Sequence, residues 1–244
     1  MKMLAFAGRN HKEILRDPLT LALSAGLPVA LLLLFTLIQR NIPVEIFNLN
    51  RLAPAMAVFS LSFLCLFSGL LISKDRSTSF LMRLYASPLR AADYILGYAL
   101  PMFPMALLQS ALCLAVSVLL GYRFSPHLFY LLLALMPVAA LFIGFGLLCG
   151  VLLPDKAVGG VNSLLINAAG LLGGMWFNLR ITSAGFQRFA YALPFAHAVD
   201  MARAAAEGRY GDILPHLWWV LGYTAVVFAI VIPLFRGRMK NGTV

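Results

Sequence analysis

Six long apolar stretches alternate with short polar segments along this chain of 244 residues. All 28 charged side chains, which are 19 Lys and Arg together with 9 Asp and Glu, lie outside these stretches. A charge at the centre of a bilayer costs roughly 2.5–3.5 kcal/mol on insertion scales, and a spanning helix needs about 20 apolar residues. The pattern therefore predicts an all-α integral membrane protein with six transmembrane helices, at about 19–38, 52–73, 95–120, 128–153, 157–178 and 215–235.

The composition agrees with a membrane protein. The chain is 61% hydrophobic and only 11% charged, against about 25% charged for an average soluble domain. Six spans leave too little chain for a separate soluble unit, so we expect residues 1–244 to form a single membrane domain. The net charge of +10 does not indicate nucleic-acid binding, because the basic residues stand beside span ends, where they set topology and meet anionic lipid.

The basic residues also predict the orientation. Twelve Lys and Arg fall in the segments on one side of the predicted spans and seven in those on the other. With an even number of spans, the positive-inside rule places both termini in the cytoplasm. Prolines in or near the spans predict kinks, because each removes a backbone hydrogen bond; these are Pro28, Pro101, Pro104 and Pro137.

The residues before the first span have the spacing of an amphipathic helix. One arc carries Met3, Leu4, Ala7, Ile14 and Leu15 together with His11, and the opposite side carries Arg9, Lys12, Glu13 and Arg16. Such a helix is typical of the membrane interface. It can serve as a topology anchor or as a docking surface for a partner, and the two roles are compatible.

The predicted cytoplasmic loop at 73–94 is the most informative polar segment. Phe80, Leu81 and Leu84 recur at helical spacing, and Pro88 ends the pattern. The loop therefore contains a short amphipathic helix between two spans. It is either an ordinary solvated loop helix or a lever on which another protein pushes.

The predicted outer segment at 180–212 is too long for a simple turn. An apolar face made of Phe186, Phe189, Ala190 and Leu193 predicts one helix, which Pro194 breaks. A second helix at about 196–207 carries charge pairs between Asp200 and Arg203 and between Arg203 and Glu207, and Gly208 ends it. Two short helices dipping into the outer leaflet fit this pattern, and so does an ordinary structured loop.

The chain lacks the motifs of an enzyme. No G-x-x-x-x-G-K-[ST] sequence is present to cradle ATP phosphates, and no Ser–His pair or H-E-x-x-H motif lies at membrane depth. We expect no catalytic residue, metal site or cofactor in this chain. A secondary transporter usually has repeated halves and ionisable groups near the midplane, which this sequence lacks. An ATP-independent secondary transporter, an intramembrane enzyme and a non-transporting scaffold stay as alternatives.

The order of these features resembles the membrane (permease) subunit of an ABC-2-type ABC exporter over essentially the whole chain. The resemblance rests on the basic amphipathic helix, the six spans, the inner loop that ends in Ser87-Pro88-Leu89, and the outer Pro194-Phe195 segment that runs to Arg203. The chain departs from the family in having Met82 where a Glu often stands beside the inner-loop Arg, and Ser77 near a usual Gly.

The resemblance implies how such a protein works. The inner loop would be the coupling helix that docks on a separate ABC ATPase (nucleotide-binding) subunit, with ATP and Mg held by that subunit, and the outer helical pair between spans five and six would be re-entrant. A second permease copy, identical or a close paralogue, would complete the transporter in membrane lipid, in a bacterial inner membrane. The ATPase-coupling residues would be Thr78, Phe80, Leu81, Arg83, Leu84 and Tyr85.

The resemblance also implies a substrate pathway between the second and fifth spans of the two halves. Its lining would be Phe59, Phe63, Phe67, Asn162 and Asn167, and the alternative is that these residues only pack the core. A path with such an apolar lining would suit the export of a hydrophobic or amphipathic substrate, such as a drug, a lipid-like compound or a glycoconjugate. Glycine pairs suited to close helix packing, within one subunit or between two, occur at Gly146-x-x-x-Gly150 and Gly170-x-x-x-Gly174.

Overall fold

The computed structural model describes residues 2–42, 47–78 and 89–241 of the chain. Throughout these residues the regular structure is helical, which confirms the predicted all-α class. The helices are α1 (Lys2–Leu15), α2 (Pro18–Arg40), α3 (Leu49–Ser77), α5 (Ala91–Ala99), α6 (Met102–Leu119), α7 (His127–Leu152), α8 (Asp155–Leu172), α9 (Ala184–Tyr191), α10 (Pro194–Ala206) and α11 (Ile213–Asn241), with 3-10 turns η1 (Leu179–Ile181) and η2 (Tyr210–Asp212).

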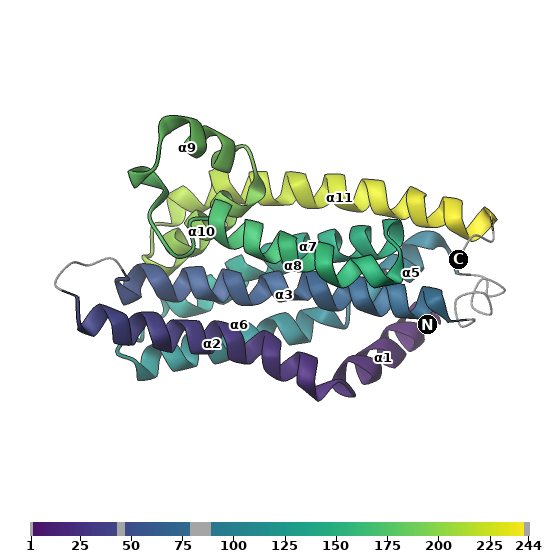
Figure 1. Ribbon diagram of the computed structural model, residues 1–244, viewed down its shortest axis with the longest axis horizontal. Helices are drawn as coiled ribbons and strands as arrows, with labels where there is room; N and C mark the ends of the chain where they lie inside the picture. The colour runs from purple at the N-terminus through teal and green to yellow at the C-terminus, as the bar shows by residue number, and fades with distance from the viewer. Residues whose placement is uncertain (1, 43–46, 79–88, 242–244) are drawn as a thin grey trace.

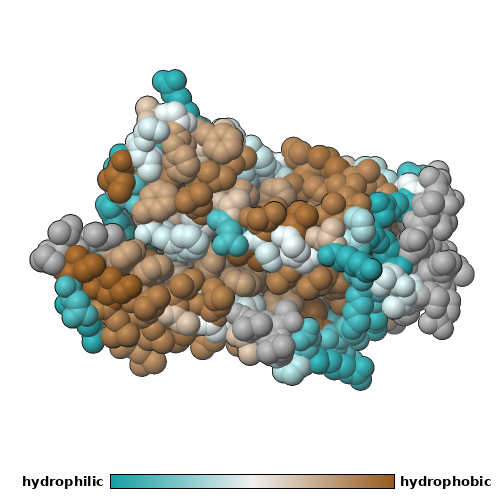
Figure 2. Space-filling model, in the orientation of Figure 1, coloured by the Kyte–Doolittle hydropathy of each residue, from teal (hydrophilic) through white to brown (hydrophobic). Residues whose placement is uncertain are grey.

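The long helices run side by side along the long axis of the molecule, and the N- and C-termini lie at the same end (Figure 1). Helix α3 is central: it contacts α2, α6, α7, α8 and α10 and is the most buried of the membrane-length helices. Its sequence is apolar on all sides, which is the pattern of a helix surrounded by others. On the outer surface, apolar side chains cover most of the middle of the face shown in Figure 2.

Four helical segments in the described residues are long and apolar enough to cross a membrane: Leu49–Ser77, Ala91–Leu119, His127–Leu152 and Tyr210–Met239. The first predicted span corresponds to α2, a helix of 23 residues. The fifth corresponds to α8, which ends at Leu172 rather than near 178, because the chain turns at Gly174 with φ of +60°. The count of six spans stays a prediction.

The predicted kink at Pro101 is present. Helix α5 ends at Ala99 and α6 begins at Met102, and the Leu100 N–H still donates to the carbonyl of Leu96. Proline has no N–H with which to continue the ladder, so the predicted span at 95–120 is two helices in sequence.

The glycine pair on α7 packs against α3 within the same chain. A Cβ atom built on Gly146 would lie 2.1 Å from the carbonyl oxygen of Cys65, and one on Gly150 would lie 2.6 Å from that of Gly69. The absence of side chains thus lets the two backbones touch. The other predicted pair does not share a helix, because Gly174 lies beyond the end of α8.

The predicted outer helices are present as α9 and α10. Pro194 occupies the first turn of α10 and so separates it from α9, and Gly208 ends the segment with φ of +74°. Nearly all residues of α10 are buried, against α3, α7 and α11, whereas α9 projects from the bundle (Figure 1). Arg203 pairs with Asp200 as predicted, but Glu207 pairs with Arg209.

Candidate functional site

The N-terminal helix α1 lies against α5, at the end of the bundle that holds both termini (Figure 1). The ring of Phe6 packs edge-on against Tyr94 and Tyr98, with centroid separations of 5.7 and 5.0 Å. Gly97 makes room for this ring, since a Cβ atom there would lie 2.4 Å from it. The predicted helix is therefore confirmed, and it is fixed to the bundle by an aromatic contact.

The face of α1 that packs against the bundle shares only part of the predicted apolar arc. The buried residues are Phe6, Ala7, Asn10 and Ile14, whereas Leu4 and Leu15 are 62% and 53% exposed. Ala7 and Ile14 of the predicted apolar arc thus pack against the bundle, whereas Leu4 and Leu15 of the same arc face outward, as a helix at the membrane interface allows. Asn10 takes a buried position because its amide has partners there: its Nδ2 donates to the carbonyl of Gly97 at 3.1 Å, and its Oδ1 accepts from Arg9 at 2.9 Å.

A buried ion pair joins α1 to the end of α3. The carboxylate of Asp75 is 3% exposed and receives both Nη atoms of Arg9, at 2.5 and 2.9 Å. The hydroxyl of Tyr98 donates to the same carboxylate at 2.9 Å, so α1, α3 and α5 meet at one side chain. Burial alone would lower the pKa of Arg9, but its hydrogen bond to Asp75 and the charge of that carboxylate outweigh burial and raise it.

A second, more exposed pair lies on the adjoining turn. Lys74 Nζ and Glu13 Oε1 are 2.7 Å apart, and the hydrogen bond from Lys74 lowers the pKa of Glu13. Exposed pairs of this kind contribute little to stability, typically about 0–1 kcal/mol. The Asp75 pair is therefore the stronger link between the two helices.

The opposite side of the α3 end is tied to the connection between α7 and α8. Ser73 Oγ donates to Asp155 Oδ1 at 2.7 Å. The guanidinium of Arg76 donates to the carbonyl of Val151 at 2.8 Å and also to that of Leu153. These carbonyls are at the C-terminus of α7, where backbone acceptors lack helical partners and attract cations. The last turns of α3 thus connect α1, α5, α7 and α8, and we call this set of contacts the α3-end network.

The predicted ATPase-coupling residues begin directly after this network. Thr78 follows the last residue of α3, and its hydroxyl donates to the carbonyl of Asp75 at 3.0 Å. Helix α3 runs to Ser77, about a turn beyond the predicted end of the span at 73. The other predicted coupling residues lie outside the described part of the chain; they are Phe80, Leu81, Arg83, Leu84 and Tyr85.

The predicted pathway residues lie on α3 and α8. Phe59 and Phe67 are buried and Phe63 is half-buried, and the rings of Phe59 and Phe63 meet edge-on at 5.5 Å. Asn162 is fully buried and joins the two helices, since its Nδ2 donates to the carbonyl of Cys65 at 3.1 Å. Asn167 is exposed on α8 and donates to the carbonyl of Ser163 at 2.8 Å. The structure brings Asn162 against α3, and Asn167 lies on the open face of α8.

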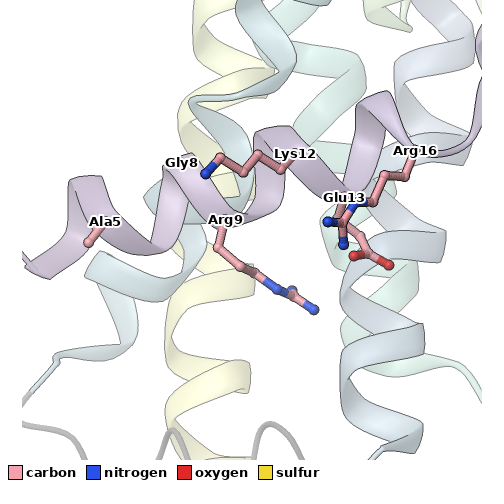
Figure 3. Close-up of a pocket in the computed structure, with 6 residues that line it drawn as sticks. All are labelled: Ala5, Gly8, Arg9, Lys12, Glu13 and Arg16. Carbon is pink, nitrogen blue, oxygen red and sulfur yellow. The ribbon is translucent and has the colours of Figure 1, made fainter.

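The exposed side of α1 is cationic. A shallow groove of about 420 Å³ is lined by Ala5, Gly8, Arg9, Lys12, Glu13 and Arg16 (Figure 3). Figure 3 shows Arg9 and Lys12 leaving the helix in different directions, so the groove has basic groups on both sides. With the exposed Leu4 and Leu15, this face has the composition of a helix at a lipid headgroup layer.

Two histidines meet at the other end of the molecule, between α10 and α11. The Nδ1 atoms of His197 and His216 are 2.8 Å apart, and His197 Nε2 faces the carbonyl of Tyr191 at 3.0 Å. A carbonyl only accepts, so Nε2 of His197 carries the proton and its Nδ1 accepts from His216. Burial lowers the pKa of His197. No cluster of three or more potential metal ligands occurs in the described residues.

The sequence pattern missed the residues of the α3-end network. The pattern places Asp75 in a cytoplasmic loop, with a solvated helix and a lever as the alternatives, and does not single out Asn10. The signals available were an amide beside the apolar arc of α1 and an acid between two cations at the end of a span. Neither signal states which side chain faces inward.

The fold and its apolar surface define a multi-pass helical membrane protein. Residues 1–206 match the family model described as ABC-2 type transporter. Because the match covers most of the chain, the protein belongs to the ABC-2 type transporter family, as a membrane permease subunit. The matched region ends with the last residue of α10. No match to the chain was found among the curated proteins.

Proposed function

We propose that this permease belongs to an ATP-driven exporter, which moves a hydrophobic or amphipathic compound out of the cytoplasm with energy from a separate ATPase subunit. The absence of a G-x-x-x-x-G-K-[ST] sequence from the chain supports a separate site for ATP and Mg. The twelve basic residues and the common end of the two termini support an arrangement with both termini in the cytoplasm, across a bacterial inner membrane (Figure 1). In this arrangement α2 and α8 complete six spans.

The α3-end network is the observation that supports the coupling mechanism. The segment from Thr78 to Tyr85 would dock on the ATPase, and its first residue, Thr78, directly follows the last residue of α3 and donates to the carbonyl of Asp75. A displacement of this segment would act first on Asp75 and Arg76, which hold α1, α5 and the α7–α8 connection. Coupling travels through such contiguous hydrogen-bond networks. The ATPase would thus move four elements through one helix end.

The substrate would pass between α3 and α8 of two copies of the permease, identical or closely related. Phe59, Phe63 and Phe67 would give the path its apolar lining, and Asn162 would hold α3 and α8 in register through Cys65. Asn167 lies on the exposed face of α8, where a second copy would cover it. An amide in lipid is unfavourable unless protein or water faces it, which supports such a cover.

A matched pair of double variants tests the coupling proposal. Leu81→Asp with Arg83→Asp alters the proposed docking segment. Arg123→Asp with Phe124→Asp makes the same change of charge at two exposed residues between α6 and α7. Both variants should insert into the membrane. In vesicles that contain the ATPase, the first should lose ATP-dependent uptake of a fluorescent amphiphile and the permease-stimulated part of ATP hydrolysis, whereas the second should keep both. Equal activity of the two variants would contradict the proposal.

A further inference from the structure

A cavity of about 690 Å³ opens at the end of the molecule opposite the termini. Its walls come from the start of α3, the segment at 175–181, the C-terminal half of α10 and the beginning of α11. It is lined both by aromatic side chains and by charges. Four arginines and three carboxylates contribute; they are Arg51, Arg180, Arg203 and Arg209 with Asp200, Glu207 and Asp212.

Two of the four arginines form ion pairs with carboxylates of the same cavity. Arg209 pairs with Glu207 at 2.7 Å and also with Asp212. Arg203 lies 3.7 Å from Asp200 and donates to the carbonyl of Gly174 at 3.0 Å. These contacts pair all three carboxylates that the described residues contribute to the cavity.

Arg51 and Arg180 differ from the other two. Both residues are exposed, and neither guanidinium group has a hydrogen bond or ion pair with any residue in the described ranges. Only their backbone atoms have partners: the carbonyl of Arg51 accepts from Arg203, and the N–H of Arg180 donates to Asn178. Among the lining side chains in the described part of the chain, four guanidinium groups and three carboxylates face the cavity. Arg51 and Arg180 therefore present two guanidinium groups that no described carboxylate pairs with, and guanidinium groups are the ones best suited to bind carboxylate or phosphate through two hydrogen bonds.

The apolar side of the cavity leads to the proposed pathway. Trp176 lines the cavity and packs edge-on against Phe59, with ring centroids 5.6 Å apart. Phe59 in turn meets Phe63 at 5.5 Å. An unbroken series of aromatic rings thus runs from the cavity along α3. An apolar tail that enters beside Trp176 would continue along the same residues that we propose for the pathway.

We propose that this cavity binds an amphiphile with an anionic head, such as a phosphate or carboxylate, held by Arg51 and Arg180, with its apolar tail against Trp176. The inference rests on the proposed function in one respect: it takes the ligand of the cavity to be the compound that the transporter exports. It narrows the substrate class from amphipathic compounds in general to anionic ones. A membrane phospholipid would present the same chemistry, so the two sources are separated below.

The test uses the purified full-length chain in a neutral detergent, with no ATPase present. The probes are dodecyl phosphate and dodecylphosphocholine, which share the tail and the phosphate but differ in net charge. Isothermal titration calorimetry gives their affinities for the unaltered chain, for Arg51→Gln with Arg180→Gln, and for the control Arg123→Gln. Arg123 is exposed at the same end of the molecule and does not line the cavity.

We expect dodecyl phosphate to bind more tightly than dodecylphosphocholine. The double variant should bind dodecyl phosphate about tenfold or more weakly, because charge-assisted hydrogen bonds are lost, and Arg123→Gln should leave the affinity unchanged. Replacing both arginines with lysine should retain only part of the binding, because lysine keeps the charge but not the paired donors of guanidinium. Equal affinity for the two probes, or equal loss with Arg123→Gln, would overturn the proposal.

Competition separates the two sources of the ligand. If phosphatidylglycerol displaces dodecyl phosphate in an Arg51- and Arg180-dependent manner, the occupant is a membrane lipid, and the assignment of the cavity to the exported substrate is overturned. If it does not, the exported single-chain amphiphile is supported. The measurement needs no ATP and no partner, so its failure leaves the coupling proposal untouched, and a failure of the coupling variants leaves this site untouched.

Discussion

Replacing Arg9 with methionine tests whether the buried pair at the end of α3 holds α1 in place. The change keeps an unbranched stem of similar length and removes the guanidinium that faces Asp75. The carboxylate of Asp75 would then stay buried, with the hydroxyl of Tyr98 as a remaining donor. A carboxylate without a cation in a low-dielectric site is strongly unfavourable.

The expected magnitude follows from burial. Removing one partner of a fully buried pair costs about 3–5 kcal/mol, because the other charge is left uncompensated. The side chain of Arg9 is 35% exposed and that of Asp75 only 4%, so water reaches one side of the pair. We therefore expect Arg9→Met to lower the free energy of unfolding by about 2–3 kcal/mol. Adding Asp75→Asn removes the stranded charge and should recover about 1–2 kcal/mol of this loss.

The assay is equilibrium unfolding of the purified chain in mixed detergent micelles, followed by circular dichroism. Lys74→Met is the matched control, since it breaks the neighbouring pair with Glu13, in which the lysine side chain is 66% exposed. Its effect should not exceed about 0.5 kcal/mol. If Arg9→Met destabilises the chain no more than this control, and Asp75→Asn gives no recovery, the assignment of the network is refuted.

Two further predictions concern packing and pH. Gly146→Ala should lower the free energy of unfolding by about 1–3 kcal/mol, because its Cβ would overlap the α3 backbone at Cys65, whereas Gly160→Ala, which has open space, should change it by less than about 1 kcal/mol. Equal effects in the same unfolding assay would contradict the packing of α7 on α3. Burial lowers the pKa of His197 below the unfolded value of about 6.5, so the neutral ring stabilises the fold above that pH and its contribution is lost as the pH falls through the lower folded pKa. The melting temperature should therefore fall more between pH 7.5 and 5 in the unaltered chain than in His197→Gln, and parallel pH profiles would refute this role.

Much of the helical framework was predictable from the sequence, because lipid imposes a simple rule on charge and length. Pro101 and Pro194 marked helix breaks correctly, since proline lacks the donor that a helix needs, and Gly208 marked a helix end. These features depend on local backbone chemistry. A single sequence carries such information directly.

The contacts between helices were less predictable, because they depend on rotation about each helix axis. Leu4 and Ile14 lie on the same predicted apolar arc, yet only Ile14 packs against the bundle, while Asn10 is buried because Gly97 offers its amide an acceptor. The sequence left open whether Gly146 packs within one subunit or between two, and only the position of α3 decides it. Asp75 is a similar case, since its burial depends on partners in two other helices.

The central claim, that a separate ATPase works this permease through the segment after α3, is tested most directly by purifying the tagged chain from its native membrane in a mild detergent. We predict that a nucleotide-binding subunit with a G-x-x-x-x-G-K-[ST] motif elutes with it in stoichiometric amount, and that this subunit is lost from the Leu81→Asp, Arg83→Asp variant. A chain that elutes without such a subunit, yet moves its substrate along a proton gradient with no ATP, would contradict the account.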